Sequence, residues 1–284
     1  MTPDIWFPNL GIQISNVNRI AFSIFGFSIY WYAIFIALGV AAGYFTAIIE
    51  VKRTNQRKED YSDILMMGFP IALVGLRLFF VIFNWELYRH DPIRIITGIR
   101  EGGLAIFGGL FASIIFVYVF SRVRKLNVWT ILDVGAPSFA IGQVIGRWGN
   151  FFNREAFGNF TENLFAMRIV RDQTVMPLTP DILANTIVYQ GVEYIQVHPT
   201  FLYESAWNLA VFTLLTWYRP RKKFAGEVFW LYLFGYGLGR FFIESIRTDQ
   251  LMLGSIPVSQ AMAALIFVAA VVAITLQRLR LKRH

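Results

Sequence analysis

Three arginines lie within stretches of the sequence that are otherwise apolar, namely Arg77, Arg147 and Arg240. An arginine at the centre of a membrane-spanning helix costs about 2.5 to 3.5 kcal/mol, so each of them needs a reason. Guanidinium groups bind phosphate through paired hydrogen bonds, and this attraction strengthens away from bulk water. Arg147 and Arg240, in their polar surroundings, therefore indicate a site for an anion. For Arg77, function and a purely structural role remain equally open.

The residues around Arg147 extend such a site along a helix. Arg147, Asn150 and Arg154 fall on one face at helical spacing, and Gly146 and Gly149 allow another backbone or a ligand to come close. The same segment contains three further candidates for substrate binding: Asn153, Glu155 and Gly158.

A second polar face runs along residues 236–247. Tyr236, Arg240 and Glu244 recur every four residues, and Arg247 follows about one turn later. This spacing aligns a phenol, a guanidinium, a carboxylate and a second guanidinium. Two such faces at one depth in a membrane would form a phosphate site, because each guanidinium can bind a pair of phosphate oxygens.

Other candidate residues gather at the corresponding ends of neighbouring segments. They are Tyr32, Gly108, Gly109, His198 and Glu204. Each has a simpler explanation, because glycine pairs serve helix packing, tyrosines anchor helices at the membrane interface, and a histidine before proline shapes a loop. Their common placement on one side of the membrane favours a shared site.

The composition indicates what kind of molecule must position these residues. Of 284 residues, 56% are hydrophobic and only 15% are charged, with a mean hydropathy of +0.52. In a soluble domain, about a quarter of all residues are charged. The composition therefore excludes a soluble enzyme and indicates an integral membrane protein, which we treat as a single domain over residues 1–284.

Seven stretches are long and apolar enough to cross a bilayer core of about 30 Å as helices. Three of them carry no charge: 20–49, 102–121 and 251–277. Four contain charged residues: 62–84, 126–147, 203–218 and 226–244. The sequence therefore predicts an all-α membrane protein with seven transmembrane helices.

Lysine and arginine predict the orientation of these helices, because strongly basic loops stay in the cytoplasm. The basic connections are 52–58, 122–125, 219–223 and 278–283. This pattern places the N-terminus outside and the C-terminus inside. It also accounts for most of the net charge of +8, so the charge reports topology and predicts no nucleic-acid partner.

The outer side would then carry two extramembrane pieces. Residues 1–19 form an arm in the outer headgroup region, where Trp6 and Phe7 are favoured. Residues 151–202 form a loop or a small extracytoplasmic cap, and the pattern at 186–189 indicates strands within it.

Histidine and cysteine usage limits the chemistry. His90, His198 and His284 all lie outside the predicted helices, and the chain has no cysteine. This excludes an intramembrane Ser-His protease, an HExxH metalloprotease and a cysteine nucleophile. We therefore expect no metal and no cofactor, and a phosphate-bearing ligand bound by arginines in the outer leaflet.

The stretch GRWGNFFNREAFG at 146–158 matches the pattern GRxGNFxNxExxG at every fixed position. This pattern is the signature of bacterial prolipoprotein diacylglyceryl transferases, which the sequence therefore resembles. HPTFLYE at 198–204 and GYGLGRFFIESIR at 235–247 look like two further family blocks. YWY at 30–32 and GGLAIFGGL at 102–110 fall where the family has blocks of its own, so the resemblance covers nearly the whole chain.

The resemblance implies an enzyme of the bacterial cytoplasmic membrane that faces the outer leaflet. Such an enzyme moves the diacylglyceryl group of phosphatidylglycerol onto the lipobox cysteine thiol in the signal peptide of a preprolipoprotein. The reaction leaves a thioether and releases glycerol phosphate. The expected partners are these two substrates and membrane lipid, and we expect a functional monomer.

The resemblance also implies roles for the candidate residues. Arg147 and Arg240 would stabilise the leaving phosphate and bias the thiol toward thiolate, with Tyr32 or Tyr236 relaying a proton. Asn150 and Asn153 would orient the headgroup, whereas Glu155 and Glu244 would hold the arginines. The remaining substrate-binding candidates are Gly158, Gly108, Gly109, His198, Glu204 and Arg247.

The chain departs from the family at Phe107, where a histidine proposed as the base for the thiol is common. A phenyl ring accepts no proton. A free thiol with a pKa of about 8.5 is already a few per cent thiolate at pH 7, and nearby arginines would lower that pKa further.

Two other functions remain open. A transporter of anions or phospholipids would carry polar residues along its whole path, including the inner half, where this sequence has few. An inactive relative would bind phospholipid without transferring it, which Phe107 leaves possible.

Overall fold

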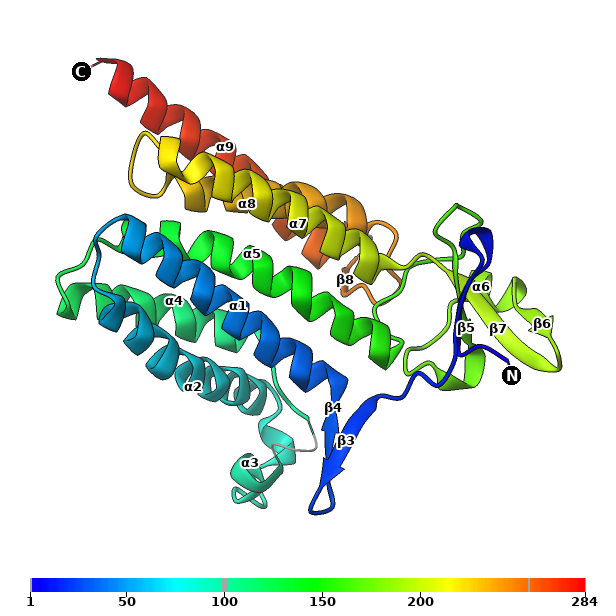
Figure 1. Ribbon diagram of the computed structural model, residues 1–284. Coiled ribbons are helices and arrows are strands. Elements are labelled where there is room, and N and C mark those ends of the chain that lie inside the picture. Colours follow the sequence, from blue (N-terminus) through cyan, green and yellow to red (C-terminus); the bar gives the residue numbers. More distant parts are fainter. Residues whose placement is uncertain (1, 99–101, 255, 284) are drawn as a thin grey trace. The chain divides into compact units, whose positions relative to one another are not determined.

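The computed structural model describes residues 2–98, 102–254 and 256–283 (Figure 1). The chain divides into a larger compact unit, residues 1–43 with 135–284, and a smaller one, residues 44–134. Helices α1 (Trp31–Arg53) and α5 (Val128–Asn153) contribute residues to both units.

Long apolar helices make up most of the described chain. Five of the helices in the described ranges are long and apolar enough to cross a membrane: α1, α2 (Lys58–Phe83), α4 (Ile106–Val123), α5 and α9 (Val258–Arg283). Helices α7 (Thr200–Tyr218) and α8 (Glu227–Glu244) coincide with the two other predicted segments, but they contain buried carboxylates and are not among these five. Of the prediction of an all-α membrane protein, the part that is confirmed is a mostly helical chain with helices that can cross a membrane.

Residues 20–30 differ from the prediction, which places them in a helix over 20–49. They form a hairpin of β3 (Ile20–Ile24) and β4 (Phe27–Tyr30), and α1 begins only at Trp31. The turn residues Phe25 and Gly26 have φ of +49° and +81°, which interrupts a right-handed helix. An uncharged apolar run fits a strand as well as a helix, so hydropathy alone misassigns this segment.

The predicted helix over 251–277 also begins too early. Strands β8 (Met252–Leu253) and β9 (Ile256–Pro257) form a short hairpin, and α9 starts after Pro257 and continues to Arg283. Proline has no backbone N–H to donate and fits the start of a helix, so the chain turns into α9 at this position.

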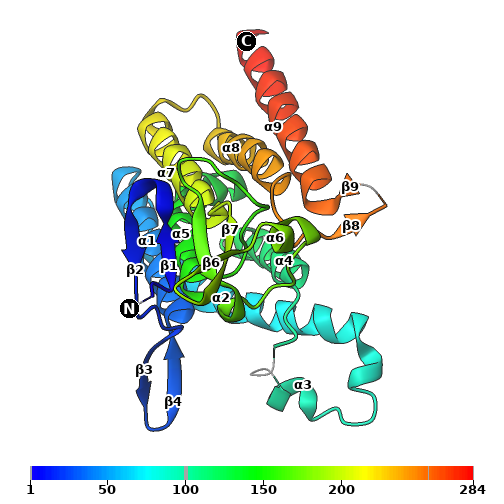
Figure 2. The same cartoon turned by 90° about the vertical axis from the view of Figure 1, so that its right-hand side faces the viewer.

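A five-stranded antiparallel sheet in the larger unit combines the N-terminal arm with residues from the predicted cap (Figure 2). The arm supplies β1 (Ile5–Phe7) and β2 (Ile12–Ile14). The cap supplies β5 (Met167–Val170), β6 (Ile187–Tyr189), β7 (Val192–Val197) and the short helix α6 (Pro180–Ala184). The order is β2-β1-β5-β7-β6, so an all-α description is too narrow.

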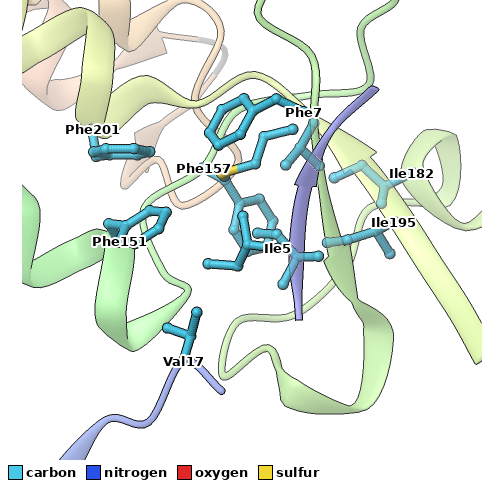
Figure 3. Close-up of a cluster of buried hydrophobic side chains, with 11 residues drawn as sticks. Ile5, Phe7, Val17, Phe151, Phe157, Ile182, Ile195 and Phe201 are labelled. Carbon is cyan, nitrogen blue, oxygen red and sulfur yellow. The ribbon is translucent and has the colours of Figure 1, made fainter. Parts of the chain in front are cut away.

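The apolar face of this sheet packs against the ends of two long helices (Figure 3). Ile5, Phe157 and Ile195 are fully buried there, together with Phe151 from α5 and Phe201 from the start of α7. Burying a side chain of this size stabilises the fold by about 1.5 to 3 kcal/mol. This core therefore fixes the two helix ends that carry Arg147 and Glu204.

The smaller unit explains Arg77. Its buried guanidinium donates hydrogen bonds to the backbone carbonyls of Arg94, Ile95, Gly102 and Gly103, at distances of 2.8 to 3.0 Å. These contacts tie α2 to the segment that includes α3 (Arg94–Thr97). Of the two explanations left open by the sequence, the geometry supports the structural one.

Candidate functional site

Arg147 of α5 and Glu204 of α7 form an ion pair, in which Nη2 of Arg147 lies 2.6 Å from Oε2 of Glu204. The two helices are held together nearby, because the Ser205 hydroxyl donates to the Val144 carbonyl at 3.0 Å. Glu204 is buried, so its charge requires a partner.

Two more arginines share the same carboxylate. Arg247 Nη1 lies 3.0 Å from Oε1 of Glu204, and Arg240 Nη1 lies 3.6 Å from Oε2. The structure thus brings the two predicted polar faces, one on α5 and one on α8, together at a single side chain of α7. Glu204 bridges Arg147 and Arg240.

The charges of this cluster are balanced. Arg240 Nη2 also contacts Glu244 at 2.6 Å, one turn along α8, and Arg247 contacts Asp249 at 2.5 Å. Burial opposes ionisation of Arg247 and Asp249, but their mutual hydrogen bonds and the opposite charges around them together outweigh it, so the pKa of Arg247 is raised and that of Asp249 is lowered. Both groups remain charged in the neutral range.

A small cavity separates the two arginines. Its volume is about 10 Å³, which leaves room for no more than roughly one water molecule. Eight residues line it: Arg147, Glu204, Trp207, Asn208, Tyr236, Gly239, Arg240 and Ile243. An anion as large as phosphate would therefore have to displace a side chain from this position.

Asn150, Asn153 and Glu155 form a second polar group next to Arg147. Both asparagines donate to Oε1 of Glu155, at 2.9 Å from Asn150 and 3.3 Å from Asn153, and Arg147 donates to Asn150 at 3.5 Å. The Glu155 amide also closes the end of α5 by donating to the Asn150 carbonyl at 3.1 Å. Four predicted site residues are thus connected.

Arg154 does not join this group, although helical spacing places it on the face of Arg147. Helix α5 ends at Asn153, and Arg154 has a φ of +55°, which turns it away from the helix. Its buried guanidinium donates to the Val17 carbonyl. Arg154 therefore connects the cap to the N-terminal segment.

Tyr32 approaches the site at Gly149. A Cβ atom added to Gly149 would lie 2.6 Å from Cδ2 of the Tyr32 ring, so only glycine permits this contact. The Tyr32 ring therefore packs on α5 at the second residue after Arg147.

Gly158 positions Arg247. Residues Gly158 and Arg247 pair as an isolated β-bridge, and a Cβ atom on Gly158 would lie 2.7 Å from the Ile246 carbonyl oxygen. This close backbone contact places Arg247 against Glu204. The geometry gives Gly158 a packing function at the site.

His198 lies beside the cluster and does not line the cavity. Its Nδ1 atom is 3.3 Å from both the Tyr203 hydroxyl and Nδ2 of Asn163, and its carbonyl accepts from the Gly158 amide at 3.0 Å. Burial lowers the pKa of His198, so the ring is neutral at pH 7.

Gly108 and Gly109 belong to the smaller unit, where they pack α4 against α2. A Cβ atom on Gly108 would lie 2.2 Å from the Gly75 carbonyl oxygen, and one on Gly109 would lie 2.8 Å from the Leu76 side chain. Their contacts thus match the helix-packing explanation, and substrate binding by them stays a prediction. Phe107, which precedes them, is 41% exposed.

The sequence motifs do not predict three further residues of the site: Trp207, Asn208 and Asp249. Asn208 follows Glu204 by four residues, and a second polar side chain on the same face of an apolar segment indicates a shared site. Trp207 and Asp249 offer no comparable pattern. In the described ranges, no cluster of three or more His, Cys, Asp or Glu side chains is arranged to hold a metal ion.

Comparison with known proteins assigns the chain to a family. The family model described as prolipoprotein diacylglyceryl transferase matches residues 19–276. The chain belongs to the prolipoprotein diacylglyceryl transferase family. A phosphatidylglycerol–prolipoprotein diacylglyceryl transferase of Bacillus mycoides (strain KBAB4) is 40% identical over 266 residues, which cover 94% of each chain.

Proteins of the same name from Bacillus cereus (strain ATCC 14579) and Bacillus anthracis are 40% and 39% identical over the same length and the same shares of both chains. As a member of the prolipoprotein diacylglyceryl transferase family, this multi-pass membrane protein is a transferase. The resemblance drawn from the sequence motifs is confirmed.

Proposed function

We infer that this enzyme transfers the diacylglyceryl group of phosphatidylglycerol to a prolipoprotein. The observation that carries the inference is the convergence of Arg147 and Arg240 on one buried carboxylate, in a chain whose relatives are named for this reaction. A pair of guanidiniums suits the single anionic group of phosphatidylglycerol, which is its phosphodiester.

The acceptor in this proposal is the lipobox cysteine of a preprolipoprotein signal peptide. Its sulfur forms a bond to the terminal glyceryl carbon of the diacylglyceryl group, and the bond from that carbon to the phosphate oxygen breaks. Glycerol phosphate leaves with the bonding electrons, and the thiol proton is released. The arginines stabilise the charge that develops on the leaving phosphate.

Glu204 holds the site ready for the phosphate. Because the cavity between Arg147 and Arg240 is only about 10 Å³, a phosphodiester can contact both arginines only by replacing the Glu204 carboxylate there. Arg247, 3.0 Å from the other carboxylate oxygen, keeps Glu204 paired during the exchange. The buried charge is thus never left without a partner.

The neighbouring residues complete the proposal. Asn150 and Asn153 orient the headgroup, Glu155 and Glu244 hold the arginines, and Tyr32 or Tyr236 relays a proton. The hydrogen bonds of Asn150 and Asn153 to Glu155 and the ion pair of Glu244 with Arg240 support these roles. Substrate binding by Gly108, Gly109 and His198 stays a prediction.

Thiol activation by the arginines replaces the base that Phe107 cannot provide. Lowering a thiol pKa by 1.5 units takes only about 2 kcal/mol, which nearby guanidiniums can supply. We therefore expect Phe107→His to change the transfer rate by less than about tenfold. An increase of several orders of magnitude, measured as initial rate against pH, would show that a general base is missing.

The orientation of the site follows from the basic loops. We propose seven spans, with α7 and α8 joining the five apolar helices, the N-terminus outside and the C-terminus inside. The arginine cluster then faces the outer leaflet of the bacterial cytoplasmic membrane. We also propose that the enzyme acts as a monomer.

A vesicle assay tests the function. Purified protein is reconstituted with phosphatidylglycerol labelled in its acyl chains, and a lipobox peptide is added. The expected result is labelled peptide, formed at least about a hundredfold more slowly by Arg147→Ala or Arg240→Ala. Arg171→Ala is the matched control, because Arg171 also has an ion pair, with Glu193, but lies on the exposed surface of the cap.

The same assay separates the alternatives. Lipid or anion flux without labelled peptide would indicate a transporter, and lipid binding with neither result would indicate an inactive relative. If Arg147→Ala and Arg240→Ala both transferred lipid at the wild-type rate, this would contradict the assignment of the site, even if the transferase function were confirmed.

A further inference from the structure

The β3–β4 hairpin carries an exposed apolar tip. Phe25 is 96% exposed, and its neighbours Ile24 and Phe27 are 49% and 59% exposed. Both views show the hairpin as a projection at the start of α1 (Figures 1 and 2). The chain has no charged side chain between residues 20 and 49. In water such a contiguous apolar surface is unfavourable, which indicates a partner for it.

The backbone does not require a phenylalanine at this turn. Phe25 and Gly26 have φ of +49° and +81°, and the β6–β7 turn at Gln190 and Gly191 has nearly the same values, +49° and +79°. Positive φ disfavours bulky residues, and the cap turn accordingly carries an exposed polar residue. Phe25 is therefore unfavourable in conformation, and its exposure is favourable only where an apolar medium surrounds it.

The two faces of the hairpin differ in polarity. Cross-strand pairing sets Phe22 opposite Ile29 and Ile24 opposite Phe27, and these four apolar residues share one face. Ser23 pairs with Ser28 on the other face, and their hydroxyls are 3.5 Å apart. Such a hairpin suits a boundary between an apolar and a polar medium.

The base of the hairpin is fixed to the rest of the larger unit. Arg19 donates to the Gln173 carbonyl of the cap at 2.6 Å, and the Trp31 amide donates to the Arg19 carbonyl at 3.0 Å. The Trp31 ring stacks on Phe152 at 5.0 Å between centroids. The exposed tip is thus held in a defined direction relative to α1.

We propose that the β3–β4 hairpin binds the lipid bilayer, with Phe25 and the face of Phe22, Ile24, Phe27 and Ile29 inserted at the boundary of headgroups and acyl chains. The hairpin leads directly into α1, so its apolar surface continues the lipid-facing surface of a spanning helix. Only helices and closed barrels satisfy their backbone groups within the hydrocarbon core, and this hairpin is an open two-stranded sheet, which excludes the core. The insertion depth is therefore about 5 to 10 Å.

The absence of cysteine in the chain makes a direct test possible, because one introduced cysteine gives one labelled site. Nitroxide labels at Phe25→Cys and at the matched turn position, Gln190→Cys, are compared in vesicles of phosphatidylethanolamine and phosphatidylglycerol. We expect the label at 25 to be relaxed by oxygen and protected from a water-soluble nickel chelate. The label at 190 should show the reverse.

Labels on adjacent positions of β4 test the orientation of the two faces. The label at Phe27→Cys should be protected from the nickel chelate at least about threefold more than the label at Ser28→Cys, since neighbouring strand residues point to opposite faces. A label at 25 that is as accessible to nickel as the label at 190 would overturn the proposal. A label at 25 located at the bilayer centre would also overturn it.

Discussion

At the scale of single residues, Glu204 determines how the arginines are arranged. Its buried carboxylate lies within 3.6 Å of Arg147, Arg240 and Arg247, which come from two other segments of the chain. Without this carboxylate the guanidiniums would repel one another. The attraction between Glu204 and these guanidiniums keeps the arginines in position for a phosphate.

Glu204→Gln should disable the enzyme. Glutamine keeps the shape of the side chain but removes the charge that Arg147 and Arg240 share. We expect transfer to fall at least about a hundredfold, and the free energy of unfolding to fall by about 3 kcal/mol. Initial rates and thermal unfolding in detergent measure the two effects.

Glu193→Gln is the control for this change, because Glu193 pairs with Arg171 on the cap surface and is 52% exposed. Loss of such an exposed pair costs about 1 kcal/mol or less. If Glu204→Gln behaved like this control in both measurements, the shared carboxylate would have no role in arranging the site.

His198 should make stability depend on pH. Burial lowers its pKa in the folded protein below the ordinary value of 6.5, so the unfolded chain binds the proton first as pH falls. Its contribution to stability is complete above pH 6.5 and is lost as pH falls from there through the folded pKa. Melting temperatures from pH 8 to 5 should therefore decline less in His198→Gln than in the wild type. An identical decline of melting temperature in both proteins would contradict His198 as the origin of this pH dependence.

At the scale of elements, hydropathy predicts the long helices because spanning segments must satisfy their backbone groups internally. It does not predict the β3–β4 hairpin, since an uncharged run such as 20–30 has no periodicity that separates strand from helix. Hydropathy also does not predict the end of α5, which depends on contacts between side chains. The helix extends past Arg147 to Asn153, which brings Asn150 and Asn153 to Glu155.

Two glycines of α5 offer a matched pair of substitutions. A Cβ atom on Gly149 would lie 2.6 Å from the Tyr32 ring, whereas one on Gly146 meets nothing within 4 Å. Gly149→Ala should displace Tyr32 and lower the transfer rate about tenfold or more. Gly146→Ala should leave the rate unchanged and stabilise the helix by up to about 1 kcal/mol.

The rates and melting temperatures of these two variants are measured in the same detergent. Equal rates in Gly146→Ala and Gly149→Ala would mean that the contact between Tyr32 and α5 does not contribute to catalysis. A loss of rate in both would point to a general effect on the helix.

At the scale of the whole molecule, the sequence identifies which residues belong to the site better than it identifies which residues they contact. The arginines, the tyrosines and the signature stretch are visible in the sequence because polar residues are rare in apolar segments. The pairing of Ile5 with Ile169, which joins the arm to the cap, links positions too distant for local patterns to reveal. For the same reason, the sequence places Glu204 among the substrate-binding residues but does not predict that it bridges Arg147 and Arg240.

The central claim is that one phosphodiester binds both arginines by taking the place of Glu204. An experimental structure in a lipid nanodisc, with phosphatidylglycerol and a lipobox peptide whose cysteine is replaced by serine, tests it most directly. We predict phosphate oxygens within hydrogen-bond distance of both Arg147 and Arg240, and an Arg147–Glu204 separation well beyond the present 2.6 Å. A headgroup bound elsewhere, with that ion pair intact, would contradict the account.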